Sequence, residues 1–129
     1  MNLEKLLESL SPNLLEGKYV FCTLQDATYG DLTDATPIAS FTEPEGLTLV
    51  LLKEAAERHN LSYQGVFRCI TLRVHSSVTA VGLTAAVSGK LNEHGISANI
   101  IAAYFHDHVF VPSHLAEKAL KLLAEFGAD

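Results

Sequence analysis

The second half of the chain alternates between stretches with the apolar spacing of strands and stretches with the apolar spacing of helices. In one stretch Leu83, Val87 and Leu91 recur every four residues, which is the spacing of one helix face. Gly95 follows as a helix stop, and His106-Asp107 reads as a turn between two short apolar runs. The pattern predicts strand, helix, strand, strand and helix over residues 62–75, 79–93, 97–105, 108–111 and 113–126.

The first half predicts four further elements. An amphipathic helix covers residues 2–10, and Ser11-Pro12 can begin another helical turn that ends at Gly17. Thr42 and Glu45 have the spacing of a capping box, so a helix is expected from Thr42 to about Asn60. Two short strands at 18–24 and 37–41 flank a polar, turn-rich connection at 25–36.

The predicted order of elements is therefore αββαβαββα, an α/β protein of the α+β sandwich type. It reads as two ferredoxin-like units, 1–65 and 66–129, each an incomplete version of a βαββαβ pattern. Because each half lacks at least one strand, the two halves are expected to share or exchange strands. Neither half is expected to fold alone.

The charge distribution narrows the classes of partner. The net charge is −6, and residues 1–65 hold the whole excess, with ten acidic against four basic side chains. There is no basic tract, which argues against binding nucleic acid or an anionic membrane. No apolar run approaches the roughly 20 residues of a membrane span, and the N-terminus lacks the pattern of a signal peptide.

The two cysteines, Cys22 and Cys69, lie in strand-like apolar runs. They are expected to be buried, reduced thiols of a cytoplasmic protein. A disulfide or a reactive thiol with a histidine base is the alternative, and the latter would imply an enzyme. The segment His106-Asp107-His108, with His114 nearby, could hold a metal ion, but it lies where a turn is expected. We therefore expect no metal, no cofactor and no catalysis.

One loop has the composition of a ligand site. The segment 75–82, between a strand and a helix, contains hydroxyls and Gly82. The free N–H groups at a helix N-terminus favour an anion such as a carboxylate, and a glycine lets a ligand approach the backbone. Asn99, a polar residue in an apolar strand, could hold an amino group. The alternative is a simple helix cap with a buried, satisfied Asn99.

These residues resemble the ACT-domain family, the small regulatory domains of amino-acid metabolism that occur, for example, in aspartate kinases. The resemblance rests on His75-Ser76-Ser77, on Val81-Gly82-Leu83-Thr84-Ala85, and on Gly95 to Ile101. The whole chain is also similar to a group of small, stand-alone bacterial proteins with two ACT-like units. The segments that carry this second likeness are Glu45-Gly46-Leu47-Thr48 and 104–112.

The resemblance implies a site and a partner. ACT domains pair with one another and bind amino acids at the interface, so a homodimer is expected. The positions that match the family's ligand site are Ser76, Ser77, Val81, Gly82, Ala98 and Asn99. Because the family often has Asp where this chain has the neutral Asn99, a zwitterion fits better than a strongly cationic ligand. The function expected is regulation by a bound amino acid, with a separate, unidentified regulated protein as a further partner. A protein-interaction module with a vestigial ligand site is the alternative.

Overall fold

The computed structural model describes residues 3–73 and 82–127, and contacts divide the chain into two compact units. The first, here called the large unit, consists of Met1–Glu16 and Arg68–Asp129. The second, the small unit, is Gly17–Phe67. This grouping differs from a linear split at residues 65 and 66, because the first sixteen residues pack with the C-terminal part of the chain.

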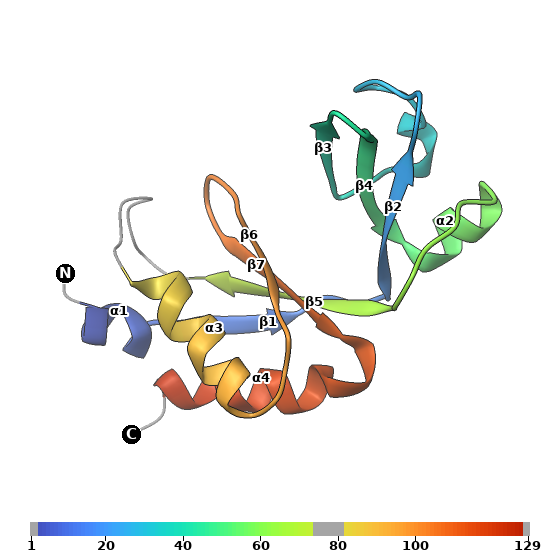
Figure 1. Ribbon diagram of the computed structural model, residues 1–129. Helices are drawn as coiled ribbons and strands as arrows, with labels where there is room; N and C mark the ends of the chain where they lie inside the picture. Colours follow the sequence, from blue (N-terminus) through green and yellow to red (C-terminus); the bar gives the residue numbers. More distant parts are fainter. Residues whose placement is uncertain (1–2, 74–81, 128–129) are drawn as a thin grey trace. The chain divides into compact units, whose positions relative to one another are not determined.

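The large unit is a four-stranded antiparallel sheet with helices on one face (Figure 1). The strand order is β1-β5-β7-β6, the order of a ferredoxin-like unit in which β1 supplies the last strand. The strands are β1 (Ser11–Leu14), β5 (Phe67–Arg73), β6 (Asn99–Ala102) and β7 (Asp107–Pro112). The helices are α1 (Leu3–Glu8), α3 (Leu83–Glu93) and α4 (Ala116–Ala124), with short 3-10 turns η2 (Ser113–Leu115) and η3 (Glu125–Gly127).

The core of the large unit lies between this sheet and its helices. Alternate residues of β5 and β7 point into it, because successive side chains of a strand face opposite sides of the sheet. The helices contribute residues at the predicted spacing of three and four. Its fully buried members include Ile70, Leu72, Val87, Leu91, Ile96, Val109, Val111, Ala119 and Leu123.

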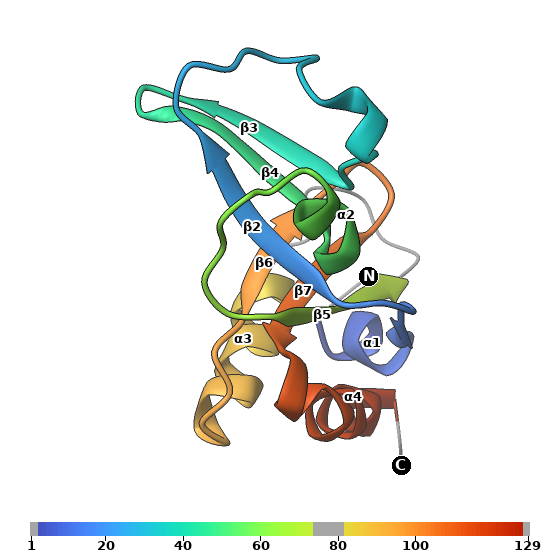
Figure 2. The same cartoon turned by 90° about the vertical axis from the view of Figure 1, so that its right-hand side faces the viewer.

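The small unit is built on the antiparallel strands β2 (Tyr19–Leu24), β3 (Ala39–Glu43) and β4 (Gly46–Leu52). The order is β3-β4-β2, and Tyr19 of β2 pairs with Phe67, the first residue of β5. Helix α2 (Lys53–Arg58) packs against β2 and β4 (Figure 2). Where a ferredoxin-like unit has its first helix, the chain instead runs through a long connection with one 3-10 turn, η1 (Thr33–Ala35).

The segment 42–52 is a correction to the sequence prediction, since it forms the end of β3, a turn and the central strand β4 rather than a helix. The capping-box pattern at Thr42 and Glu45 is local, whereas β4 pairs along its length with β2 on one side and with β3 on the other. Backbone pairing on both edges outweighs a helix signal of this kind. The predicted helix stop at Asn60 does follow α2, and Asn60 has φ 57°.

A second correction concerns Ser11 and Pro12, which begin strand β1 and not a helical turn. Strand β1 pairs with β5 in the register Ser11↔Arg73 to Leu14↔Ile70. Pro12 lacks an N–H, but β1 is the edge strand of the large unit's sheet, where proline is tolerated. The strand that the C-terminal half lacks is therefore β1, from the N-terminal segment of the same chain.

The remaining elements differ from prediction mainly at their ends. Strand β5 begins at Phe67 rather than at residue 62, and the hairpin turn between β6 and β7 falls at Tyr104-Phe105, two residues before the expected position. Gly95, at φ 74°, ends α3 as predicted, with its N–H donating to the carbonyl of Asn92 at 3.0 Å. The final helix is entered through η2 rather than through a side-chain cap from Ser113.

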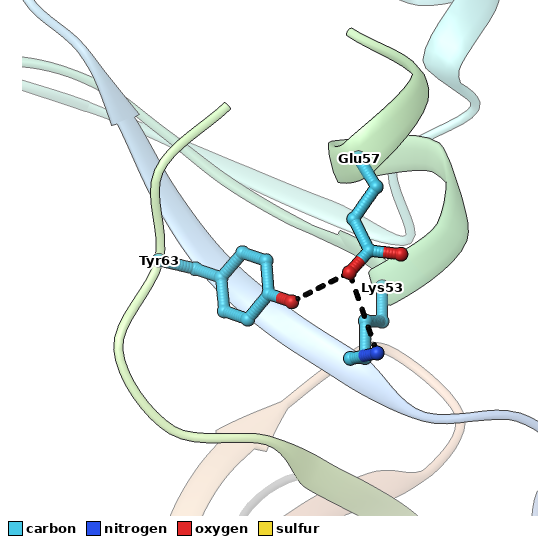
Figure 3. Close-up of polar contacts among 3 residues, drawn as sticks. All are labelled: Lys53, Glu57 and Tyr63. Atoms are coloured by element: carbon cyan, nitrogen blue, oxygen red, sulfur yellow. Dashed lines mark hydrogen bonds and ion pairs between the residues drawn. The ribbon is translucent and has the colours of Figure 1, made fainter. Parts of the chain in front are cut away.

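A polar clip fastens the connection after α2 back onto that helix (Figure 3). The Tyr63 hydroxyl donates to Glu57 Oε2 at 2.9 Å, and Lys53 Nζ lies 3.3 Å from the same oxygen. The hydrogen bond from Tyr63 and then the Lys53 ammonium lower the pKa of the Glu57 carboxyl. The clip is therefore complete at neutral pH and is lost as the pH falls through that lowered pKa.

Candidate functional site

Gly82 lies directly before the first turn of α3 and has a backbone conformation that favours glycine. Its φ is 92°, in the left-handed region. Its carbonyl accepts the Ala86 N–H at 2.9 Å, so the helical hydrogen bonding starts here. Because Gly82 has no side chain to cap the helix, the first N–H groups of α3 have no side-chain acceptor from that position. This is the local geometry that an anionic group of a ligand requires.

Leu3 of helix α1 lies close to Gly82. A Cβ atom added to Gly82 would lie 3.1 Å from Leu3 Cδ2, closer than ordinary van der Waals contact. A side chain at this position would be strained by its φ, and it would also require Leu3 to move by a few tenths of an ångström. The N-terminal helix, to which the sequence analysis assigns no part of the site, therefore lies next to the start of α3.

Ala98 and Asn99 lie at the start of β6, the edge strand at the other side of the large unit's sheet. Ala98 packs against the core, whereas Asn99 is exposed and pairs in register with Phe110. Strand β6 covers only residues 99–102 of the predicted strand 97–105, and the alternative that Asn99 is a buried, satisfied polar residue is wrong. Its exposure leaves the carboxamide open to a ligand or to another chain.

The structure describes three of the six predicted site residues. Gly82 directly precedes α3 (Leu83–Glu93), whereas Ala98 and Asn99 follow this helix, five and six residues beyond Glu93. Ser76, Ser77 and Val81 lie outside the described residues.

The cysteines have the environment that the sequence predicts. Both Cys22 and Cys69 are buried and free. Burial raises the pKa of the Cys69 thiol to about 11, against a smaller opposing effect of a hydrogen bond with Thr71, and burial also raises the pKa of Cys22. Nucleophilic chemistry needs a thiolate, so neither environment suits a nucleophile at neutral pH.

Of the possible metal ligands, Asp107 and His108 lie in β7 and His114 lies in η2. His108 Nδ1 lies 2.9 Å from the Thr71 hydroxyl on the neighbouring strand, and burial, together with nearby His106, lowers the pKa of His108 against the opposing effect of Asp107. Among the described residues, no three His, Cys, Asp or Glu side chains are grouped closely enough to hold a metal ion.

Sequence reasoning missed a pocket in the small unit. The connection 25–36, which reads as a solvated loop, packs Ala35 into the core through η1 and leaves a pocket of about 390 Å³ beside strands β3 and β4. Two signals in the sequence point to it. A predicted hairpin has a connection too long for a turn, and residues 19–52 contain no Lys or Arg.

Taken together, the two units define a class, a mixed α/β protein with two ferredoxin-like units. In the large unit, a glycine stands directly before the first helix of the βαββαβ pattern, α3. Matches to known families give this class a name. ACT domains match residues 1–68 and again residues 65–125. The chain belongs to the ACT-domain family, and it contains two such domains in tandem. The predicted family and fold class are confirmed.

Solved structures agree with this assignment. A protein of unknown function from Vibrio cholerae, described as a possible transport protein, is 54% identical and superposes with a TM-score of 0.90, over 97% of this chain and 95% of that one. A structure of aspartokinase alpha and beta subunits is similar at 14% identity and a TM-score of 0.65, over 90% and 96% of the two chains.

The regulatory subunit of aspartate kinase from Thermus thermophilus, in its ligand-free form, is similar at 12% identity and a TM-score of 0.59, over 90% of this chain and 95% of that one. At these identities the aspartate kinase structures establish the shared fold and no more. A search of curated proteins finds no match. No helix in the parts of the chain that the structure describes has the length and apolar character needed to cross a membrane.

Proposed function

We propose that this ACT-domain protein is a non-catalytic regulator that binds an amino acid at the entrance of α3. ACT domains are in general regulatory domains that bind small molecules, and residues 65–125 of this chain match one. The observation that carries the proposal is Gly82, whose φ of 92° and lack of a side chain leave the first N–H groups of α3 without a side-chain cap from that position. A ligand carboxylate would be bound there by backbone N–H groups.

The ligand's amino group would be held by Asn99 of a second copy of the chain. Gly82 directly precedes α3, whereas Asn99 lies in the edge strand β6, six residues beyond the end of that helix. In a homodimer that places one copy's Asn99 beside the other's Gly82, each ligand would contact both copies. The exposure of Asn99 on an edge strand supports such an arrangement.

The absence of catalysis is supported by the surroundings of the candidate nucleophiles. Cys22 and Cys69 are buried, with raised thiol pKa values. Two free thiols also fit a reducing compartment, and we place the protein in the cytoplasm on that ground. Its output would then pass to a separate protein, whose activity depends on whether the amino acid is bound.

Thermal denaturation with each of the twenty amino acids tests the proposal. A ligand at one hundred times its dissociation constant stabilises the folded state by about 2.7 kcal/mol, a rise of several degrees in Tm for a domain of this size. Asn99→Ala should remove the rise, whereas Asn92→Ala, an exposed asparagine on α3, should keep it. A response that survives Asn99→Ala would move the site elsewhere.

A second candidate function is a protein-interaction module with a vestigial ligand site. It is favoured by the tip of the β6–β7 hairpin, where Tyr104 and Phe105 are 81% and 79% exposed, with ring centroids 4.9 Å apart. Adjacent exposed aromatic side chains are common at binding surfaces. No change in Tm with any of the twenty amino acids would favour this alternative over the first.

A further inference from the structure

The pocket of the small unit is a separate feature, outside the amino-acid site proposed above. We call it the loop pocket and define it by Tyr29, Asp31, Thr36, Ile38, Leu47 and Leu49. Its volume of about 390 Å³ falls within the range of about 300 to 1,000 Å³ that is usual for small-molecule sites. The pocket lies where a connection with a single 3-10 turn, η1, takes the place of the first helix of the fold.

The floor of the loop pocket is apolar and fixed. Leu47 and Leu49 are both 1% exposed and lie on the same face of β4, since they are two residues apart. Ile38 forms part of the wall, and its N–H donates to the carbonyl of Val50 at 2.7 Å. This backbone bond ties the end of the loop to the sheet. Ile38 itself is 43% exposed, so its side chain offers an apolar surface to the hydrocarbon part of a ligand, above the buried Leu47 and Leu49.

The rim of the pocket is held by hydrogen bonds within the loop. Asp31 Oδ2 accepts the Thr28 N–H at 2.9 Å, and the Asp31 N–H donates to the Thr28 carbonyl at 3.0 Å. The other carboxylate oxygen of Asp31 takes no part in this turn. Leu32 and Thr36, on either side of η1, have left-handed φ values of 59° and 48°. A pocket wall held in this way needs little reordering when a ligand binds.

The charges around the loop pocket have one sign. Asp31 is the one lining side chain with a formal charge, and residues 19–52 contain five acidic side chains with no Lys or Arg. The small unit as a whole has seven acidic against three basic side chains. An anionic ligand would be repelled, and a cationic one would gain attraction from Asp31 without a competing positive side chain in the lining.

Tyr29 adds an aromatic surface at the mouth of the pocket. It is 81% exposed, which leaves its ring available to a ligand. An aromatic face attracts an ammonium group within about 6 Å of its centre, and quaternary ammonium groups are bound in proteins by such rings. A carboxylate, an aromatic ring and an exposed apolar side chain are the three features that recognise an organic cation.

We propose that the loop pocket binds a small organic cation, with its ammonium group between Asp31 and the ring of Tyr29 and its carbon chain against Ile38. The occupant is distinct from the amino acid proposed for the large unit, because the lining offers no positive side chain for a carboxylate. The two sites lie in different units of the chain. The tandem protein would thus carry two small-molecule sites, one for a zwitterion and one for a cation.

Isothermal titration calorimetry of the full chain with choline tests this proposal. The control ligand is the neutral isostere of choline in which a tert-butyl group replaces the trimethylammonium group, with the same shape and no charge. We expect choline to bind and the isostere to bind at least about tenfold more weakly, since the charge is the main attraction. Equal affinity for the two compounds, or no binding of choline, would overturn the proposal.

Two variants separate the pocket from the general acidity of the unit. Asp31→Asn removes the charge but keeps an oxygen that can accept the Thr28 N–H, so the loop should keep its turn. Asp26→Asn removes the same charge from an exposed position of the same loop, outside the pocket lining. We expect choline affinity to fall about tenfold or more in Asp31→Asn and to change little in Asp26→Asn. Equal losses in both would indicate a diffuse electrostatic effect and sink the idea.

The large-unit site provides a further check that keeps the two proposals apart. Asn99→Ala should leave choline binding unchanged, since Asn99 belongs to the large unit and the loop pocket to the small one. Tyr29→Ala should weaken choline binding, while Tyr29→Phe, which keeps the ring, should retain it. A loss of binding in Tyr29→Phe as large as in Tyr29→Ala would rule out the ring as the recognising group.

Discussion

Gly82 has a backbone conformation and a neighbour that each disfavour a side chain. Its φ of 92° is strained for other residues, and an added Cβ would meet Leu3 at 3.1 Å. Gly89, in contrast, lies inside α3 with nothing within 4 Å of an added Cβ. The two glycines are therefore a matched pair, one required by the local structure and one not.

Gly82→Ala should destabilise the protein by about 1–2 kcal/mol, because an L-residue in the left-handed region costs roughly that amount. Gly89→Ala should stabilise it by up to about 1 kcal/mol through helix propensity. Urea denaturation of both variants measures the difference. A Gly82→Ala variant as stable as the wild type would contradict the constraint described here.

His108 couples stability to pH. Its lowered pKa means that the unfolded chain, with an ordinary histidine pKa near 6.5, takes up a proton before the folded one. Stability from this residue is full above pH of about 6.5 and falls as the pH drops from there toward the lowered folded pKa. Thermal melts from pH 8 to 5 should show this loss in the wild type and a smaller one in His108→Asn.

The exposed His114 is the control for that measurement. His114→Asn should reproduce the wild-type dependence on pH, because His114 has no part in the contact with Thr71. Identical curves for His108→Asn and the wild type would show that another group dominates the loss of stability. Thr71→Val complements the test, since leaving the half-buried imidazole without its 2.9 Å partner should cost about 1–2 kcal/mol.

Strand β1 is attached to β5 by hydrogen bonds that continue past the end of the strand. Besides its pairing with β5, the chain continues to Leu15, whose N–H donates to the Cys69 carbonyl at 2.9 Å. The guanidinium of Arg68 donates to the Leu15 carbonyl at 2.9 Å. These bonds extend the attachment beyond the four residues of the strand itself.

Leu15→Pro should destabilise the protein by about 1–3 kcal/mol more than Leu15→Ala. Both variants remove packing contacts of the leucine side chain, but only proline removes the N–H and leaves the Cys69 carbonyl without its donor. Guanidinium denaturation followed by far-UV circular dichroism provides the comparison. Equal stability of the two variants would mean that the bond at Leu15 contributes little.

At the scale of elements, the sequence predicted what local periodicity determines. Helix α3 and its stop at Gly95, the β6–β7 hairpin and α4 all follow from apolar spacing and breakers. The segments 11–14 and 42–52 were predicted as helical because Ser-Pro and Thr-x-x-Glu are helix-start patterns. Their strand conformation depends on partners distant in sequence, β5 for the first and β2 for the second, which a local pattern does not encode.

The candidate sites were predictable to the same extent. Gly82 and Asn99 could be selected from their residue types and from the family resemblance, but the exposure of Asn99 follows from the position of β6 at a sheet edge, which depends on strand order. The loop pocket depends on how residues 25–38 cover β4, a tertiary detail that the composition of the loop does not specify.

At the scale of the whole molecule, segments that are distant in the sequence pack in the same unit. The family matches divide the chain near residues 65–68, whereas Met1–Glu16 packs in the large unit with Arg68–Asp129. A fragment of residues 66–129 therefore lacks the fourth strand of its sheet, β1, and helix α1, whose Leu3 lies close to Gly82. We expect this fragment to be largely unfolded or aggregated by itself.

Adding a synthetic peptide of residues 1–16 to that fragment should restore β-sheet and helix signal in circular dichroism, because it supplies α1 and β1. A peptide with Pro12 kept and Leu6 and Leu10 replaced by Ser is the control, since both leucines are buried in the core of the large unit. A fragment that folds fully without the peptide would contradict the role assigned to β1.

The position of β1 also imposes an order of events during synthesis. The ribosome makes Ser11–Leu14 before the partner strand Phe67–Arg73, and at usual elongation rates the interval is on the order of several seconds. Throughout that interval the early strand has no partner, and an open strand edge invites pairing with other chains. Pro12, which breaks the row of donors on this strand, would limit such pairing while the nascent chain waits for the rest of its sheet.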